Sequence, residues 1–187
     1  MNKISDKKRA IFESTLELIK ENGFHGTPMS MVAKNAKVAA GTIYHYFESK
    51  DELILALYDY NRGRVTDTIE LALAEDLPFK EKFFKVWRNL YAFYIDNPNV
   101  LIFFEQFMNS PYNTNKCPSY TKGLYYELLQ KGMEEGVIKR ARPEVLVIYL
   151  VSNIHTLAKL HRFGNICLDE IELNDFMNIL WKGLAVE

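Results

Sequence analysis

Apolar side chains recur every three or four residues along most of this chain, with charged residues between them. That spacing places them on one face of an α-helix. Only 9 glycines and 6 prolines interrupt the 187 residues, whereas a sandwich or a barrel needs many closely spaced turns. The pattern predicts an all-α protein with about nine helices and no strand. No fixed period repeats along the chain, which argues against a helical solenoid.

Capping and breaking residues mark the helix ends. Gly23 ends the first helix, and Thr27 is expected to cap the second, with Pro28 at its first position. Ser49, with Glu52 three residues later, predicts a capping box before a long helix. The expected helices cover residues 6–22, 28–37, 40–46, 50–74, 79–95, 100–108, 119–135, 143–163 and 173–185, and the polar stretch 112–119 is expected to be a flexible loop.

The composition, 48% hydrophobic and 25% charged, is that of an ordinary globular protein. The first residues lack the apolar core of a secretory signal, and the longest apolar run, residues 145–151, is too short to cross a bilayer. Cys117 and Cys167 lack the spacing of a disulfide framework or a metal site and are expected to be free thiols. We therefore expect a cytoplasmic protein with no membrane partner, no metal and no cofactor.

Charge is distributed unevenly along the chain. The formal net charge is −1, which argues against a protein that coats nucleic acid non-specifically. Residues 1–50 nevertheless carry eight Lys and Arg against five Asp and Glu, a net charge of +3. An excess of this size permits DNA binding at the N-terminal end without establishing it.

The expected second and third helices are short and joined by a three-residue turn, which is the layout of a helix-turn-helix. Ile43 and Phe47 lie one turn apart and can anchor the third helix, which leaves its polar side chains outside. The segment from Thr27 to Leu53 closely resembles the signature of the TetR family of bacterial transcriptional regulators. The resemblance is carried by Gly41-Thr42-Ile43-Tyr44-His45-Tyr46-Phe47, by Ser49-Lys50 after it and by Asn22-Gly23-Phe24 ahead of it.

The resemblance is strong over residues 8–55 and only architectural beyond them. It implies a DNA-binding helix-turn-helix domain at residues 1–50 and a ligand-binding and dimerisation domain at 51–187. A regulator of this kind binds a pseudo-palindromic double-stranded DNA operator as a homodimer, because one motif contacts only about half a site. The implied function is a repressor that leaves its operator when a small, largely apolar effector binds in the C-terminal domain.

Each expected DNA contact has a physical basis. Gly41 allows close approach to the sugar-phosphate backbone, and Thr42 and His45 can reach base edges from the exposed face. Tyr44 can donate its hydroxyl to a phosphate, while Tyr46 is either a similar contact or a packing residue. The full set of predicted DNA-binding residues is Thr27, Ala40, Gly41, Thr42, Tyr44, His45 and Lys50.

Two positions depart from the family pattern. Lys37 stands where a glycine is common, so a lysine is expected in the left-handed conformation. Ala39 replaces a common serine and forfeits a cap worth about 1 kcal/mol. The third helix also lacks Arg and Lys, which excludes bidentate recognition of guanine from it. The basic residues Lys34, Lys37 and Lys7-Lys8-Arg9 can either contact phosphates or form a solvated face.

Aromatic residues gather in the expected helices 79–95 and 100–108. A pocket lined by aromatic rings with a few polar tips suits an apolar small molecule, although each ring can equally be a core residue. The candidate ligand-binding residues are Trp87, Tyr91, Phe103, Phe107, Tyr125 and His155, and His155 is also compatible with a satisfied buried histidine.

The last two long helices are the expected dimer interface, as the resemblance implies and as their apolar faces allow. Two such helices from each subunit can form an intermolecular four-helix bundle, although the same faces can also pack within one subunit. The candidate interface residues are Leu150, Ile154, Leu157, Phe176, Leu180 and Gly183, with Ile179 on the same helix face.

A metalloenzyme and an activator or adaptor are the alternatives to a repressor. A helical-bundle metalloenzyme is disfavoured, because the chain has no Glu-x-x-His motif, no phosphate loop and no nucleophile elbow. An activator or adaptor that uses the same helix-turn-helix remains the alternative, because the sign of regulation depends on the position of the operator.

Overall fold

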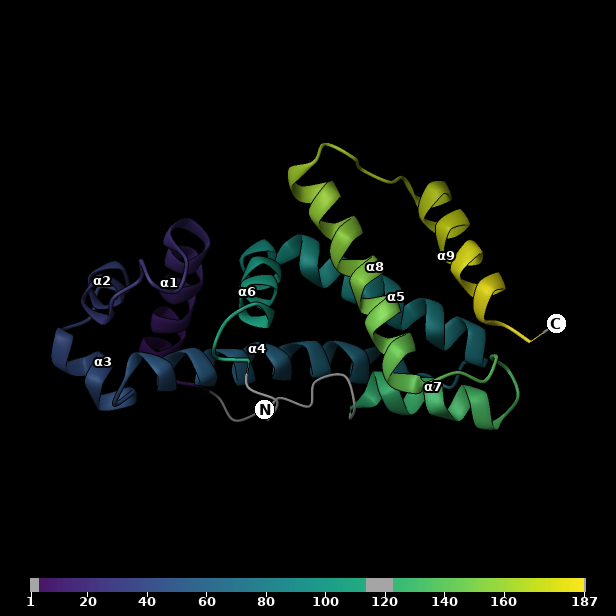
Figure 1. The fold of residues 1–187 in the computed structure, drawn as a ribbon, viewed down its shortest axis with the longest axis horizontal. Helices are drawn as coiled ribbons and strands as arrows, with labels where there is room; N and C mark the ends of the chain where they lie inside the picture. Colours follow the sequence, from purple (N-terminus) through teal and green to yellow (C-terminus); the bar gives the residue numbers. More distant parts are fainter. Residues whose placement is uncertain (1–3, 114–122, 187) are drawn as a thin grey trace. The chain divides into compact units, whose positions relative to one another are not determined.

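The structure is a computed structural model that describes residues 4–113 and 123–186. These residues form nine α-helices and no strand, as predicted (Figure 1). The only extended pairing among them is an isolated bridge between Ile138 and Ala185. Cys117 and most of the predicted loop at 112–119 lie outside the described residues. The helices are α1 (Asp6–Asn22), α2 (Met29–Asn35), α3 (Ala40–Tyr46), α4 (Lys50–Leu73), α5 (Phe79–Asp96), α6 (Pro98–Met108), α7 (Leu124–Glu134), α8 (Pro143–Phe163) and α9 (Glu170–Leu184).

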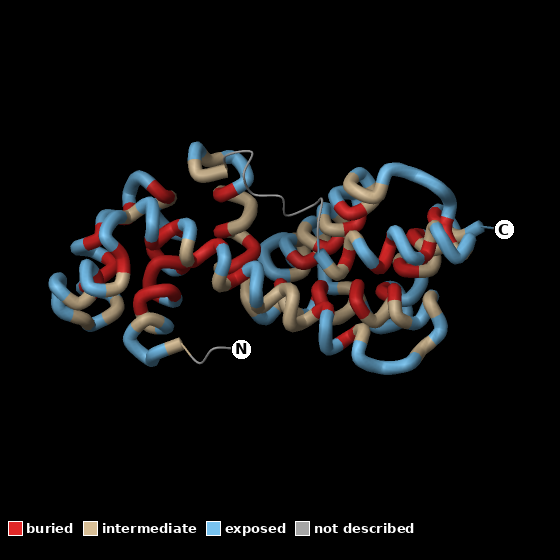
Figure 2. Tube along the Cα trace, turned by 90° about the horizontal axis from the view of Figure 1, so that it is seen from below, coloured by how far each residue is buried: buried red, intermediate tan, exposed pale blue. Residues whose placement is uncertain are grey.

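The chain packs as two compact units, Met1–Arg62 with Asn99–Thr114 and Gly63–Pro98 with Asn115–Glu187. The predicted functional division at residue 50 differs from this packing division, because α6 packs with the N-terminal helices. Along the helices of each unit, buried and exposed stretches alternate, which is the amphipathic pattern expected from the sequence (Figure 2). No helix in the described parts of the chain is both long and apolar enough to cross a membrane.

Aromatic packing holds α6 in the first unit. Phe103 meets Phe24 at 5.9 Å between ring centroids, and Phe107 stacks on Tyr58 at 4.3 Å. The side-chain amide of Gln106 donates to the carbonyl oxygen of Ile19, at the end of α1, over 3.2 Å. Phe103 and Phe107 are fully buried here. Of the two roles that the sequence left open for them, these contacts support that of core residues, here in the first unit, and their role in an effector pocket stays a prediction.

In the second unit, α5 packs on α8, and α7 packs on α8. One face of α5 carries three aromatic residues that contact α8 and α9. The hydroxyl of Tyr91 lies 3.0 Å from His161 Nδ1, the ring of Tyr94 is 4.5 Å from the ring of His155, and Trp87 packs on Phe176. These apolar contacts form the core of the unit.

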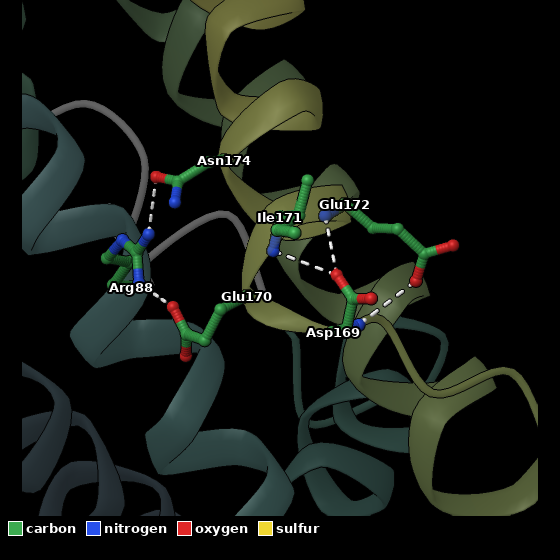
Figure 3. A network of polar contacts seen from close by, with 6 residues as sticks. All are labelled: Arg88, Asp169, Glu170, Ile171, Glu172 and Asn174. Carbon is green, nitrogen blue, oxygen red and sulfur yellow. Dashed lines mark hydrogen bonds and ion pairs between the residues drawn. The ribbon is translucent and has the colours of Figure 1, made fainter.

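Polar contacts hold the two ends of α9. Arg88 on α5 donates to Glu170 Oε2 at 2.7 Å and to Asn174 Oδ1 at 2.6 Å, as Figure 3 shows. Asp169 and Glu172 form a capping box at the first turn. After α9, the backbone N–H of Val186 donates to the carbonyl of Val137 over 3.1 Å. The helix is thus tied to α5 at its start and to the segment after α7 at its end.

Candidate nucleic-acid interface

The third helix is anchored by two buried side chains. Ile43 and Phe47 are buried as predicted, and Phe47 packs on Phe12 of α1 at 5.6 Å between centroids. Because these apolar groups lie on the inner side of α3, the polar residues of the helix must face outward.

The turn between α2 and α3 confirms the prediction for Lys37. Its φ is 53°, in the left-handed region, although lysine has a Cβ that disfavours this conformation by about 1–2 kcal/mol. The backbone N–H of Val38 donates to the carbonyl of Ala33 at 3.0 Å, which supports the turn. Ala39 is the N-cap of α3 and makes no side-chain capping bond, also as predicted.

The outer face of α3 carries three polar residues, and two small residues lie at the start of the helix. Tyr44 is 56% exposed, His45 is exposed and Thr42 is half-buried. Ala40 and Gly41 are exposed at the start of the helix. A Cβ placed on Gly41 would meet no atom within 4 Å, and the φ of Gly41 is not positive. The fold of this unit therefore does not require glycine at position 41.

Tyr46 has a structural partner. Its hydroxyl lies 3.1 Å from Ser5 Oγ, and Ser5 also caps α1 by accepting from the backbone N–H of Lys8. The side chain is half-buried. Of the two interpretations left open by the sequence, these contacts support a packing role for Tyr46 rather than a DNA contact.

The predicted roles of Thr27 need correction. Thr27 is only 2% exposed, and its hydroxyl donates to the carbonyl of Gly23 at 2.8 Å. The N-cap of α2 is Pro28, with no side-chain capping bond. Thr27 therefore closes the turn after α1 instead of capping α2, and its buried hydroxyl does not present itself to a phosphate. The helix begins one residue later than the Thr-Pro pattern predicts, because the first backbone donors of α2, from Met31 and Val32, bond to the carbonyl of Pro28.

Lys50 also has a partner within the protein, because its ammonium group donates to the carbonyl of Phe24. Ser49 caps α4 as predicted, with Glu52 N–H at 3.1 Å from Ser49 Oγ. Glu52, however, accepts from the backbone N–H of Glu48 at 2.6 Å, one residue earlier than a capping box requires.

The other basic residues divide into two groups. Lys8 lies over the rings of Phe12 and Phe47, at 5.6 and 5.4 Å from their centroids, so it packs on the first unit. Lys7, Arg9, Lys34 and Lys37 are exposed. These four can contribute positive charge around the outward face of α3.

Two family models cover most of the chain. The model "Bacterial regulatory proteins, tetR family" matches residues 11–57, and "Tetracyclin repressor-like, C-terminal domain" matches residues 78–185. The chain belongs to the TetR family. Family members are transcriptional regulators with a helix-turn-helix DNA-binding domain, and α2 and α3 are this motif here.

Individual TetR-family proteins are similar over nearly the whole length. An HTH-type transcriptional regulator of Haemophilus influenzae is 26% identical over 180 residues, covering 96% of both chains. The crystal structure of a TetR-family regulator from the same species matches with a TM-score of 0.86 and 25% identity, over 97% of both chains. The Bacillus subtilis regulator FadR, solved in complex with stearoyl-CoA, matches with a TM-score of 0.72 and 21% identity, over 93% of this chain and 95% of that one.

The C-terminal part of this TetR protein contains three buried polar atoms without a hydrogen-bond partner among the described residues. They are the indole Nε1 of Trp87 on α5, the hydroxyl of Tyr125 on α7 and Nε2 of His155 on α8. Nε2 of His155 therefore has no protein partner in the described part of the chain, which the interpretation as a satisfied histidine did not predict. Burial raises the pKa of the Tyr125 hydroxyl and lowers the pKa of His155 to about 4, so both side chains are neutral at pH 7. Tyr91 differs, because its hydroxyl is bonded to His161.

Half of the six predicted dimer residues are internal. Leu150, Ile154 and Leu180 are buried within the subunit, so assigning them to an interface was wrong. Leu157 and Phe176 are half-buried, whereas Gly183 is exposed. Both helices nevertheless carry large exposed apolar side chains on their other faces, namely Val145, Ile148, Tyr149 and Phe163 on α8 and Ile171 and Ile179 on α9, the last two 72% and 67% exposed.

Proposed function

We propose that this TetR protein is a cytoplasmic repressor that binds a pseudo-palindromic operator as a homodimer and leaves it when an apolar effector binds the second unit. The outward face of α3 is the observation that carries the proposal. In the proposed complex, Thr42 and His45 contact base edges in the major groove, and Tyr44 donates its hydroxyl to a phosphate. Ala40 and Gly41 leave room for the sugar-phosphate backbone.

Electrostatic attraction comes from residues around α3 rather than from the helix itself. Lys34 and Lys37 flank the turn, and Lys7 and Arg9 lie at the start of α1. Contacts with phosphates position a protein without selecting a sequence, so these side chains supply affinity. The proposed role of Lys50 is mainly to connect α4 to the loop that precedes α2, because its ammonium group already donates to the carbonyl of Phe24.

The dimer in this proposal uses the exposed apolar residues of α8 and α9. Ile171 and Ile179 lie on α9, and Ile148 and Tyr149 lie on α8. Large apolar side chains gathered on exposed helix faces mark interaction surfaces. A two-fold axis would pair both helices with their copies in a four-helix arrangement and bury these groups.

The effector in this proposal binds among α5, α7 and α8. Buried polar groups are nearly always hydrogen-bonded, and three of them here have no protein partner. Trp87 can only donate, and Tyr125 and His155 are neutral. These groups suit an apolar chain that carries an uncharged polar group, such as the carbonyl of a thioester. FadR binds stearoyl-CoA, as its structure records, so fatty-acyl compounds are the first class to test.

The DNA-binding part is tested with operator sequences selected from random duplexes by the purified dimer. Tyr44→Ala and His45→Ala are expected to abolish binding in a gel shift, while size-exclusion chromatography still shows a folded dimer. Glu13→Ala, on an exposed position of α1, is the matched control and should bind as the wild type does. Full operator affinity in both Tyr44→Ala and His45→Ala would refute the assignment.

The sign of regulation and the release step are tested separately. Transcription of a reporter behind the selected operator should rise when the gene is deleted, whereas a fall would establish the activator alternative. Acyl-CoA thioesters of increasing chain length should dissociate the wild-type complex with the operator. A complex that survives saturating concentrations of all of them would exclude this effector class.

A further inference from the structure

A cleft of about 670 Å³ opens in the first unit, away from the residues of α3 and entirely outside the second unit. Phe24 and His25 line it from the segment between α1 and α2, and Asp51 from the first turn of α4. Glu105 of α6 and Tyr112, which follows α6, also line the cleft. Three separate segments of the DNA-binding unit therefore meet at this cleft.

The cleft combines aromatic rings with negative charge. The rings of Phe24 and Tyr112 pack against each other at 5.2 Å between centroids, and Phe24 is 9% exposed. Asp51 and Glu105 bring two carboxylates, and among the described residues that line the cleft His25 alone has a side chain that can carry positive charge. The Tyr112 hydroxyl bonds to Asp51, and burial together with this carboxylate raises the pKa of Tyr112. Charge complementarity thus favours a cationic ligand.

The type of cation follows from the arrangement of these groups. In the described part of the chain, no three His, Cys, Asp or Glu side chains come together in a way that could hold a metal ion. Ring faces attract organic cations, whose charge is spread over apolar groups, and carboxylates add Coulomb attraction. We propose that this cleft is a second ligand site, which binds an organic ammonium ion that carries an apolar group.

The site is independent of the proposed effector site. Its ligand would contact Phe24, whose carbonyl oxygen accepts a hydrogen bond from Lys50 at the start of α4. It would also contact Tyr112, whose hydroxyl bonds to Asp51, the residue after Lys50. A bound ammonium ion therefore links the loop before α2, the start of α4 and the end of α6. Ligands that bind only the folded state stabilise it, so thermal unfolding should shift upward with ligand concentration.

The experiment uses the full-length wild-type protein and benzyltrimethylammonium as the probe. Its uncharged carbon analogue, neopentylbenzene, has the same shape and tests the role of charge. Binding is followed by NMR of the histidine and tyrosine rings at physiological ionic strength. Saturable shifts are expected at His25 and Tyr112, with none at His155 or His161.

A double variant, Asp51→Asn with Glu105→Gln, should bind the cation at least tenfold more weakly while retaining the wild-type fold by circular dichroism. The matched control is Glu13→Gln with Glu81→Gln, which changes the net charge equally at exposed positions outside the cleft. Equal binding by the double variant, equal binding of the uncharged analogue, or shifts confined to His155 and His161 would each overturn the proposal. Operator binding is not part of the readout, so the result is independent of the proposed repressor function.

Discussion

Replacing Gly41 with alanine separates the needs of the fold from the needs of DNA binding. The added methyl group meets no atom within 4 Å in the free protein, and the backbone conformation is one that alanine adopts readily. Alanine favours a helix over glycine by up to about 1 kcal/mol. We therefore expect Gly41→Ala to raise the melting temperature, by about 2–4 °C for each kcal/mol in a chain of this size.

The same methyl group should weaken operator binding. It projects from the start of α3, where the proposed complex brings the sugar-phosphate backbone close. If one contact with a charged phosphate is lost in each half-site, at about 1.5 kcal/mol each, the dimer loses about 3 kcal/mol. Because about 1.4 kcal/mol corresponds to a tenfold change, operator affinity should fall on the order of 100-fold.

Fluorescence anisotropy with the selected operator and thermal melting on the same sample measure both effects. Gly63→Ala is the matched control, because Gly63 is also an exposed helical glycine with no atom within 4 Å of a Cβ. The control should gain stability and keep its affinity. A Gly41→Ala protein that melts earlier, or that binds the operator as tightly as the wild type, would refute the reasoning.

Three further predictions concern the second unit. Ile179→Glu should give a monomer in analytical ultracentrifugation and no operator binding in a gel shift. The control Leu71→Glu, at an equally exposed leucine on α4, should remain dimeric. A dimeric Ile179→Glu protein would place the interface elsewhere. Tyr125→Phe removes a buried hydroxyl without a partner, so urea unfolding should show a gain of about 1 kcal/mol while effector release weakens; a loss of stability would contradict this. Burial lowers the pKa of His155 to about 4 from 6.5, so its contribution to stability is complete above pH 6.5 and is lost as the pH falls toward 4. Relative to His155→Phe, the wild type should lose about 2 kcal/mol between pH 7 and pH 5 in urea unfolding, and parallel pH profiles would disprove the burial argument.

Much of the fold could be predicted because local signals and tertiary packing agree along this chain. The outward orientation of Tyr44 and His45 followed from the two buried anchors Ile43 and Phe47 on the other side of a seven-residue helix. The left-handed Lys37 followed from the resemblance, because a glycine is common at this position of the turn. In each case one short segment contains all the residues that determine the result.

The errors arose where the partner of an apolar face had to be known. Periodicity shows that Leu150 and Leu180 are buried, but the same pattern serves a subunit core and a dimer interface. Phe103 and Trp87 occupy neighbouring helices in the sequence, yet they belong to different packing units. The unpartnered atoms of Tyr125 and His155 could not be predicted either, because hydrogen bonding inside a bundle depends on the rotation of each helix.

The contacts of Arg88 with Glu170 and Asn174 have a consequence for the choice of subunit partner (Figure 3). The buried face of α9, which includes Leu173, Met177 and Leu180, fixes the rotation of the helix about its own axis, and the two bonds from one guanidinium group, one turn apart on α9, fit that rotation. In this rotation Ile171 and Ile179 are exposed together with polar neighbours such as Glu172, and they are the large apolar side chains that α9 leaves outside the subunit core. In the proposed dimer, a related regulator with other side chains at positions 171 and 179 would present a different surface, so we expect mixed dimers between the two to assemble poorly.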